Sequence, residues 1–261
     1  MVGFLLVVSA SWGSSCGGGI EGTCVSEIGE ALSRNTAVGA PLTAQVNHRP
    51  ASGTMRRIYD ANARRIADMQ SRLRGTQASD LERFLDHYNR NRARYQAVAD
   101  AVHLPPELIA ALHWRESTGN FQTYMHQGDP LGRRPRNHPT DIPTFYKWEN
   151  SAVHALGQKA WLRDGLQLSE HSSDMAALAT YAEYYNGLGY SHRGVSSPYV
   201  FSGTDQYNRG KYVSDGRYSR LTRDNQLGVV AMVQAIWQQG GRTSVVSQSS
   251  SHNTRRLPPD V

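Results

Sequence analysis

The chain has 261 residues, of which 39% are hydrophobic and 19% are charged. This apolar content is enough to build a core, so the composition excludes wholesale disorder. The longest apolar run, residues 2–8, is much shorter than the ~20 residues of a membrane-spanning helix. The net charge of +6 favours anionic partners such as a cell wall, a nucleic acid or a membrane surface.

The first fifty residues are predicted to be a leader and flexible linker. Residues 2–10 are apolar and small residues follow, as in a signal peptide, but no Lys or Arg occurs before Arg34. Two interpretations therefore stay open. The segment is an export signal, with Cys16 lipid-modified or paired with Cys24, or it is a disordered tail with two idle thiols. Two cysteines cannot form a cysteine zinc cluster or a disulfide scaffold.

Between the two ends, apolar residues recur at helical spacing. The pattern predicts helices over 55–73, 81–102 and from Pro105 onward, followed by helices over 149–163, 173–185 and 224–238. Strand signals are scarce, and residues 197–201 form the best short candidate; long loops are expected over 120–147 and 187–223. The sequence thus predicts a mainly α fold with little or no β structure.

The expected domain boundaries follow from this pattern. Residues 51–240 form the catalytic-sized domain, with N-terminal helices over 51–100 and a core over 101–240. Residues 241–261 are rich in Ser and contain an Arg-Arg-Leu-Pro-Pro stretch, which predicts a flexible tail.

The sharpest local signal is the acid at the end of the third helix. Glu116 follows Leu108 and Leu112 at steps of four, so it lies on the apolar stripe and points toward the core or the floor of a cleft. Burial and the nearby helix C-terminus both raise the pKa of such a carboxyl. An acid that stays protonated near neutral pH can protonate a glycosidic oxygen. A capping glutamate or one paired with Arg115 is the alternative.

Three segments in order carry a family resemblance. Residues 108–119, with their Arg-Glu-Ser ending, resemble the catalytic helix of the lytic transglycosylase and goose-type lysozyme superfamily, and residues 94–109 are similar to the helix and turn that lead into it. Residues 185–187, Tyr-Asn-Gly, resemble the family's Tyr-Asn-Ala-Gly segment. The resemblance covers roughly residues 80–240 and implies a lysozyme-like fold, with Glu116 as general acid and Ser117 beside it in the substrate site.

Further substrate-binding candidates lie near the predicted site. Tyr185, on the inner face of its helix, is expected to orient the Glu116 carboxyl or to contact a sugar, with core packing as the alternative. Asn186 is either a helix cap or, by the family match, a sugar contact. Tyr124 belongs to a set of loop aromatics suited to stacking on sugar rings.

A second carboxylate would decide the mechanism, and Asp129 and Asp141 are the candidates. Asp129 stands in Gly-Asp-Pro, which is also typical of a turn. An inverting glycosidase needs a base ~6.5–9.5 Å from the acid, and a retaining one a nucleophile at ~5–5.5 Å. The family's Gly-Leu-Met-Gln segment is not present in that form, and residues 128–132 stand in its place.

The resemblance implies chemistry with a single glutamate. Glu116 would cleave the bond between N-acetylmuramic acid (MurNAc) and N-acetylglucosamine (GlcNAc) in peptidoglycan strands, as in a lytic transglycosylase. A hydrolytic muramidase and a non-catalytic wall-binding protein are the alternatives. Such a protein would be exported to the cell envelope or the exterior, or delivered to the wall by a phage.

No other partner is indicated. The histidines lack metal-ligand spacing such as His-Glu-x-x-His, so no metal is expected, and the sequence calls for no cofactor. No zinc finger, RNP-type motif or Gly-rich phosphate loop supports nucleic-acid binding. The sequence leaves the oligomeric state open.

Overall fold

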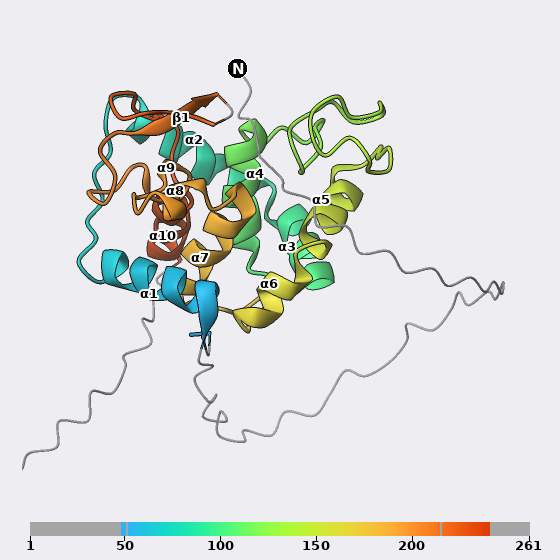
Figure 1. The fold of residues 1–261 in the computed structure, drawn as a ribbon. Helices are drawn as coiled ribbons and strands as arrows, with labels where there is room; N and C mark the ends of the chain where they lie inside the picture. Colours follow the sequence, from blue (N-terminus) through green and yellow to red (C-terminus); the bar gives the residue numbers. More distant parts are fainter. Residues whose placement is uncertain (1–47, 51, 215, 241–261) are drawn as a thin grey trace, which may run out of the picture. The chain divides into compact units, whose positions relative to one another are not determined.

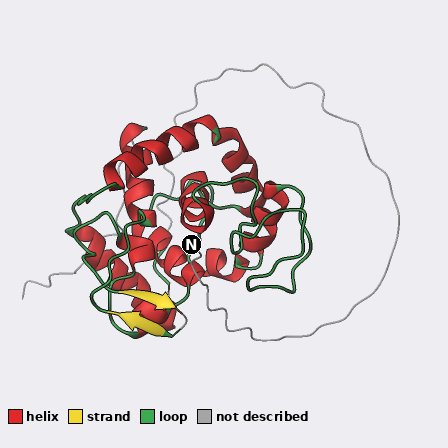
Figure 2. Ribbon diagram, turned by 90° about the horizontal axis from the view of Figure 1, so that it is seen from above, coloured by secondary structure: helices red, strands yellow, loops and turns green. Residues whose placement is uncertain are grey.

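The computed structural model describes residues 48–50, 52–214 and 216–240. Nearly all of the predicted leader and linker, including Cys16 and Cys24, lies outside the described residues, and so does the predicted tail, 241–261. The part of the chain that the structure describes is mainly helical, which confirms the predicted fold class (Figures 1 and 2).

The described elements follow one another along the chain as helices with one late hairpin. The helices are α1 (Gly53–Ala67), α2 (Gln77–Arg90), α3 (Arg92–Val102), α4 (Pro106–Ser117), α5 (Trp148–Gly157), α6 (Ala160–Gly165), α7 (Met175–Asn186), α8 (Gly189–His192), α9 (Pro198–Phe201) and α10 (Val229–Gln239). The strands β1 (Lys211–Ser214) and β2 (Arg217–Ser219) pair antiparallel, with Lys211 opposite Ser219.

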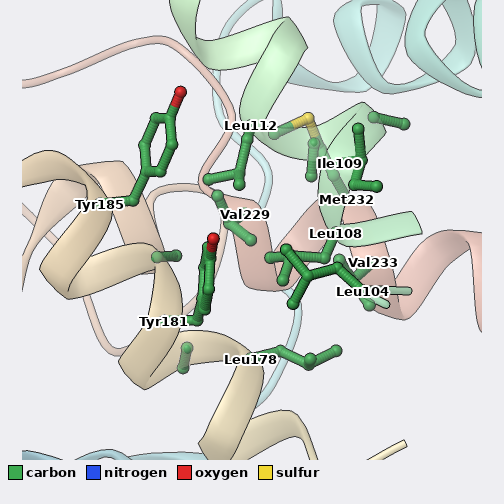
Figure 3. Close-up of a cluster of buried hydrophobic side chains, with 14 of the residues drawn as sticks. Leu104, Leu108, Ile109, Leu112, Leu178, Tyr181, Tyr185, Val229, Met232 and Val233 are labelled. Carbon is green, nitrogen blue, oxygen red and sulfur yellow. The ribbon is translucent and has the colours of Figure 1, made fainter. Parts of the chain in front are cut away.

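Helix α4 is buried on all sides for most of its length. Every residue from Pro106 to Trp114 is buried, and α4 packs against α2, α3 and α10. A helix that is apolar all round belongs inside a protein rather than at its surface. Helix α10 also packs against α7, and Figure 3 shows side chains of α4, α7 and α10 facing one cluster: Leu108, Ile109, Leu112, Leu178, Tyr181, Tyr185, Val229, Met232 and Val233.

Two predicted helices are each broken in two. The helix expected over 81–102 is α2 and α3, which are separated by Asn91; the side-chain amide of Asn91 donates to the carbonyl of His87, 2.9 Å away. The helix expected over 149–163 is α5 and α6, with the break at residues 158–159. The hydrophobic stripe continues across both breaks, so periodicity alone does not locate them.

Other predicted boundaries are also corrected. Residues 197–201, the strand candidate, form α9 instead, with Pro198 in the first helical turn, where its missing N–H costs least. The first helix ends at Ala67 rather than near residue 73, and the chain beyond it is extended far enough for the N–H of Arg72 to bond to the carbonyl of Gly203 at 2.8 Å. The hairpin lies within the expected loop 187–223.

Residues 48–50, which precede the predicted boundary at residue 51, also contact the domain. His48 is buried, and its ring nitrogen Nδ1 lies 3.0 Å from the carbonyl oxygen of Leu166. Arg49 pairs with Asp60 of α1 at 2.7 Å. Residues 48–50 of the predicted linker therefore pack on the domain.

Candidate functional site

Glu116 lies where the buried helix α4 reaches the surface. Residues up to Trp114 are buried, whereas Arg115, Glu116 and Ser117 are partly accessible. The helix ends at Ser117, and Thr118 and Gly119 both take positive φ values, 55° and 72°. The predicted helix end is therefore confirmed, and the carboxyl stands at the margin of the core.

The Glu116 carboxyl is bonded to a tyrosine from α9. The hydroxyl of Tyr199 donates to Oε1 of Glu116 at 2.8 Å, and the Tyr199 side chain is buried. Burial raises the pKa of Glu116 to about 7, against smaller opposing effects of the Tyr199 bond and of the cations Arg115 and Lys159. The group is thus an acid that is half protonated near neutral pH.

Tyr199 is held in turn by Arg115. The Arg115 guanidinium carbon lies 4.7 Å from the centroid of the Tyr199 ring. The same guanidinium donates to the Asp224 carboxylate at 3.0 Å and to the carbonyl of Leu227 at 3.2 Å. Arg115 therefore pairs with Asp224, and the alternative of an Arg115–Glu116 ion pair is not what the structure shows.

Tyr185, the tyrosine expected to hold the carboxyl, has a different partner. Its hydroxyl donates to the backbone carbonyl of Met125 at 3.0 Å. Its pKa is raised well above the usual value, first by burial and then by the charge of Glu116, so the two side chains still belong to one neighbourhood. The Lys159 ammonium lies 5.5 Å from the Tyr185 ring centroid.

The chain that follows α4 closes one side of this site. Besides the Tyr185 bond, Met125 donates its N–H to Oγ of Ser151 at 3.0 Å. Gly128, with φ of 78°, passes so close to α4 that a Cβ there would stand 3.1 Å from the carbonyl oxygen of Glu116. The loop is thus tied to α4, α5 and α7 around the acid.

The two acidic candidates of this loop, Asp129 and Asp141, form no hydrogen bond with Glu116 in the described structure. Both Asp129 oxygens accept hydrogen bonds, from the backbone N–H groups of Arg136 and Asn137 at 2.7 and 2.8 Å and from the Asn137 amide at 2.7 Å. This pattern braces a loop, as the Gly-Asp-Pro turn alternative expected. Asp141 is exposed.

Tyr124 is fully buried rather than presented to a substrate. Its hydroxyl donates to the carbonyl of Arg133 at 2.8 Å and accepts the N–H of Phe145 at 3.0 Å. In this arrangement the ring has no free face for a sugar, and its contacts hold the two ends of the loop together.

Ser117 and Asn186 lie at helix ends near the site. Ser117 donates to the carbonyl of His113 at 3.4 Å within its own helix, and it remains partly accessible. Asn186 is the last residue of α7 and is also partly accessible, while the positive φ of 95° falls on Gly187. Asn186 is therefore not a left-handed cap, and its role as a sugar contact stays a prediction.

Sequence reasoning missed Tyr199, Lys159 and Asp224 as parts of the site. Tyr199 lay within the strand candidate 197–201, Lys159 lay within the helix expected over 149–163, and Asp224 was expected to begin the last helix, which starts at Val229. None carries a local motif. All three lie far from Glu116 in the sequence, and only the fold brings them near it, so a single sequence does not reveal their place in the site.

The described residues hold no group of three or more His, Cys, Asp or Glu side chains able to bind a metal ion. Likewise, no helix in the described part is long and apolar enough to cross a membrane. Comparisons of the chain with protein-family models, with curated proteins and with solved structures find no match.

Proposed function

We propose that this protein is a glycosidase that cleaves peptidoglycan between MurNAc and GlcNAc, with Glu116 as its general acid. The observation that carries the proposal is the placement of that carboxyl, which stands at the end of a buried helix, accepts a hydrogen bond from the buried Tyr199 and has its pKa raised by burial to about 7. A general acid works best when its pKa lies near the working pH, because it must both hold and release its proton. The family resemblance around residues 108–119 supplies the substrate class.

The proposed reaction uses the same glutamate twice. Protonated Glu116 gives its proton to the glycosidic oxygen while the bond from MurNAc C1 to that oxygen breaks. The resulting carboxylate then takes the proton of the C6 hydroxyl, whose oxygen bonds to C1 and closes an anhydro ring. The Tyr199 hydroxyl supports the carboxylate between these steps, since a hydrogen bond to the charged form stabilises it.

Single-glutamate chemistry is favoured over a two-carboxylate mechanism. The oxygens of Asp129 are committed to the loop, and Asp141 is exposed. The charged side chains that act on the pKa of Glu116 are both cations, Arg115 and Lys159. We therefore place a lytic transglycosylase first and a hydrolytic muramidase, in which water attacks C1, second.

A peptidoglycan substrate also bears on partners and location. The protein would have to reach the cell envelope or the exterior, either by export or as part of a phage particle, and its net charge of +6 suits an anionic wall. The proposal includes no nucleic acid partner.

Digestion of purified sacculi, with mass spectrometry of the released muropeptides, tests the proposal. A lytic transglycosylase releases anhydro products that are lighter by one water than those of a muramidase. Glu116→Gln should release neither product. Glu183→Gln is the matched control, because Glu183 is also a buried glutamate whose pKa is raised by burial, but it accepts its hydrogen bond from Ser191 and not from Tyr199. If the parent protein binds sacculi but releases no muropeptide, the result would favour the alternative of a non-catalytic wall-binding protein.

A further inference from the structure

The positive charge of Arg115 favours the ionised form of Glu116, and so it opposes the protonated state that the proposed general acid needs. The two residues are consecutive in α4, and of the two cations that lower the pKa of Glu116, Arg115 has the larger effect. An arginine paired with a carboxyl lowers its pKa by roughly 1–3 units. An unopposed Arg115 would therefore leave Glu116 ionised and unable to act as an acid at neutral pH.

Asp224 occupies the guanidinium instead. The two side chains are only 6% exposed, and their charged atoms lie 3.0 Å apart. Asp224 is itself fixed, because its Oδ1 accepts the N–H of Gln226 at 3.1 Å and lies 3.6 Å from the Lys211 ammonium of β1. Burial alone would raise the pKa of Asp224, but Arg115 and Lys211 hold it below its usual value, so the group is a carboxylate.

The pairing also sets where the arginine plane lies. With one edge on Asp224 and the Leu227 carbonyl, the guanidinium covers the ring of Tyr199, whose hydroxyl bonds to Glu116. We propose that Asp224 is a positioning residue for Glu116: it binds and neutralises Arg115, so that this arginine supports Tyr199 instead of pairing with the catalytic carboxyl.

The inference rests on the proposed role of Glu116, and the other groups around that carboxyl are kept constant in its test. They are Tyr199 from α9, Tyr185 from α7 and Lys159 between α5 and α6; the charge of Lys159 also lowers the pKa of His126 in the loop after α4, after the larger effects of burial and of His154. Asp224 pairs with Arg115 through one carboxylate oxygen and lies near Lys211 through the other.

The experiment is an NMR titration of the Glu116 carboxyl in full-length protein labelled with ¹³C-glutamate, with Glu116→Gln used to assign the resonance. Asp224→Asn should lower the midpoint by about one unit, because Arg115 is then uncompensated. The double variant Arg115→Met/Asp224→Asn should return it to near the parental value. Glu149→Gln, which removes the carboxylate of the separate Arg94–Glu149 pair, should leave it unchanged.

Enzyme rates provide the second readout. In Asp224→Asn, the alkaline limb of the rate of sacculus digestion should move to lower pH by the same amount, with about a fivefold loss at pH 7 and little loss at pH 5. A merely structural role would lower the rate equally at both pH values. If the titration shifts but no variant or parent cleaves sacculi, the proposed function fails and the positioning role stands.

A second comparison covers the case in which Asp224→Asn does not fold. Arg115→Met alone leaves the Asp224 carboxylate uncompensated except by Lys211, so the Glu116 midpoint should rise, and adding Asp224→Asn should bring it down again. The inference would be overturned if the Glu116 midpoints of all proteins in either comparison agree within about 0.3 pH unit, or if they move in the opposite direction. A change of about one pH unit is the usual size for a charge this close.

Discussion

The Glu116 carboxyl connects the stability of the fold to pH. Its pKa is raised from an ordinary value of 4.5 to about 7 by burial, so between these pH values the folded protein holds a proton that the unfolded chain has lost. The contribution of Glu116 to stability is therefore greatest below about pH 4.5, declines as the pH rises toward 7, and is lost above it. The acid that suits catalysis is thus a cost to the fold at alkaline pH.

Glu116→Gln should remove this pH dependence. At pH 5 the variant and the parent should have similar free energies of unfolding, and at pH 8 the variant should be more stable by up to about 3 kcal/mol. Denaturant unfolding at both pH values, followed by circular dichroism, measures the difference. A parent that is at least as stable as the variant at pH 8 would contradict the raised pKa.

Tyr199→Phe should slow cleavage by roughly 10–100-fold with little change in melting temperature, because it removes the bond to Glu116 and keeps the buried ring. Since that bond lowers the pKa of Glu116, its loss should also move the alkaline limb of the rate profile to higher pH. Rates of sacculus digestion between pH 5 and 9 measure both effects.

Tyr185→Phe is the matched comparison, because Tyr185 is equally buried but bonds to the Met125 carbonyl. It should destabilise the fold by about 1–3 kcal/mol by leaving a buried carbonyl without its donor, and change the rate less than Tyr199→Phe. The reverse order of the two rate effects would return the role of holding Glu116 to Tyr185.

The two tyrosines also show what the sequence can predict at this scale. Helical spacing correctly predicted that Glu116 and Tyr185 lie on the inward faces of their helices, because periodicity indicates which face of a helix is buried. It does not report which inward groups meet. The bond from Tyr199 to Glu116 joins residues 83 positions apart, and it depends on the path of the chain between α7 and α9.

At the scale of elements, the short helix α9 reaches the site only because α10 allows a close approach. Gly228, just before α10, donates its N–H to the Ser202 carbonyl at 2.7 Å. A Cβ at Gly228 would stand 2.5 Å from the carbonyl oxygen of Val200 and 2.6 Å from the nitrogen of Ser202. These are backbone atoms beside Tyr199, so they cannot move aside as a flexible side chain would.

Gly228→Ala should therefore destabilise the fold by about 1–3 kcal/mol or more, and it should lower the rate of cleavage even where the protein is fully folded, since α9 must shift. Gly157→Ala is the control, because α5 leaves open space at that position. It should be neutral or stabilising by up to about 1 kcal/mol. Thermal unfolding and sacculus digestion measure the pair, and equal melting temperatures would show that α9 and α10 are less tightly joined than described.

Element positions were predictable where apolar spacing and a stop coincide, and not elsewhere. Helix α4 ends at Thr118-Gly119 as predicted, because positive φ values there prevent continuation. The break at Asn91, where the side-chain amide and the backbone N–H both bond back to the carbonyl of His87, lies inside one apolar stripe, and the β1–β2 hairpin is a short, partly exposed pair with no clear alternation of apolar residues. Such features are decided by local hydrogen bonds rather than by the hydrophobic pattern.

At the scale of the whole molecule, the hydrophobic core and the net charge have different effects. The core around α4 fixes the acid, whereas the net charge of +6 acts at a distance on any partner. Composition predicts that distant attraction without any knowledge of the fold. It does not identify the partner, because a cell wall and a nucleic acid are both polyanions.

Binding to the wall should consequently weaken as salt is added, while cleavage chemistry at Glu116 should not. Exposed charges interact over about 10 Å at 0.1 M salt but only about 3 Å at 1 M. We expect the Glu116→Gln protein to sediment with purified sacculi several-fold less at 0.5 M than at 0.05 M salt. Adding DNA at 0.15 M salt measures whether a nucleic acid displaces the protein from the sacculi. Efficient competition by DNA would favour a nucleic-acid partner, because that attraction is itself steeply salt-dependent. Salt-independent sedimentation would assign wall binding to contacts other than charge.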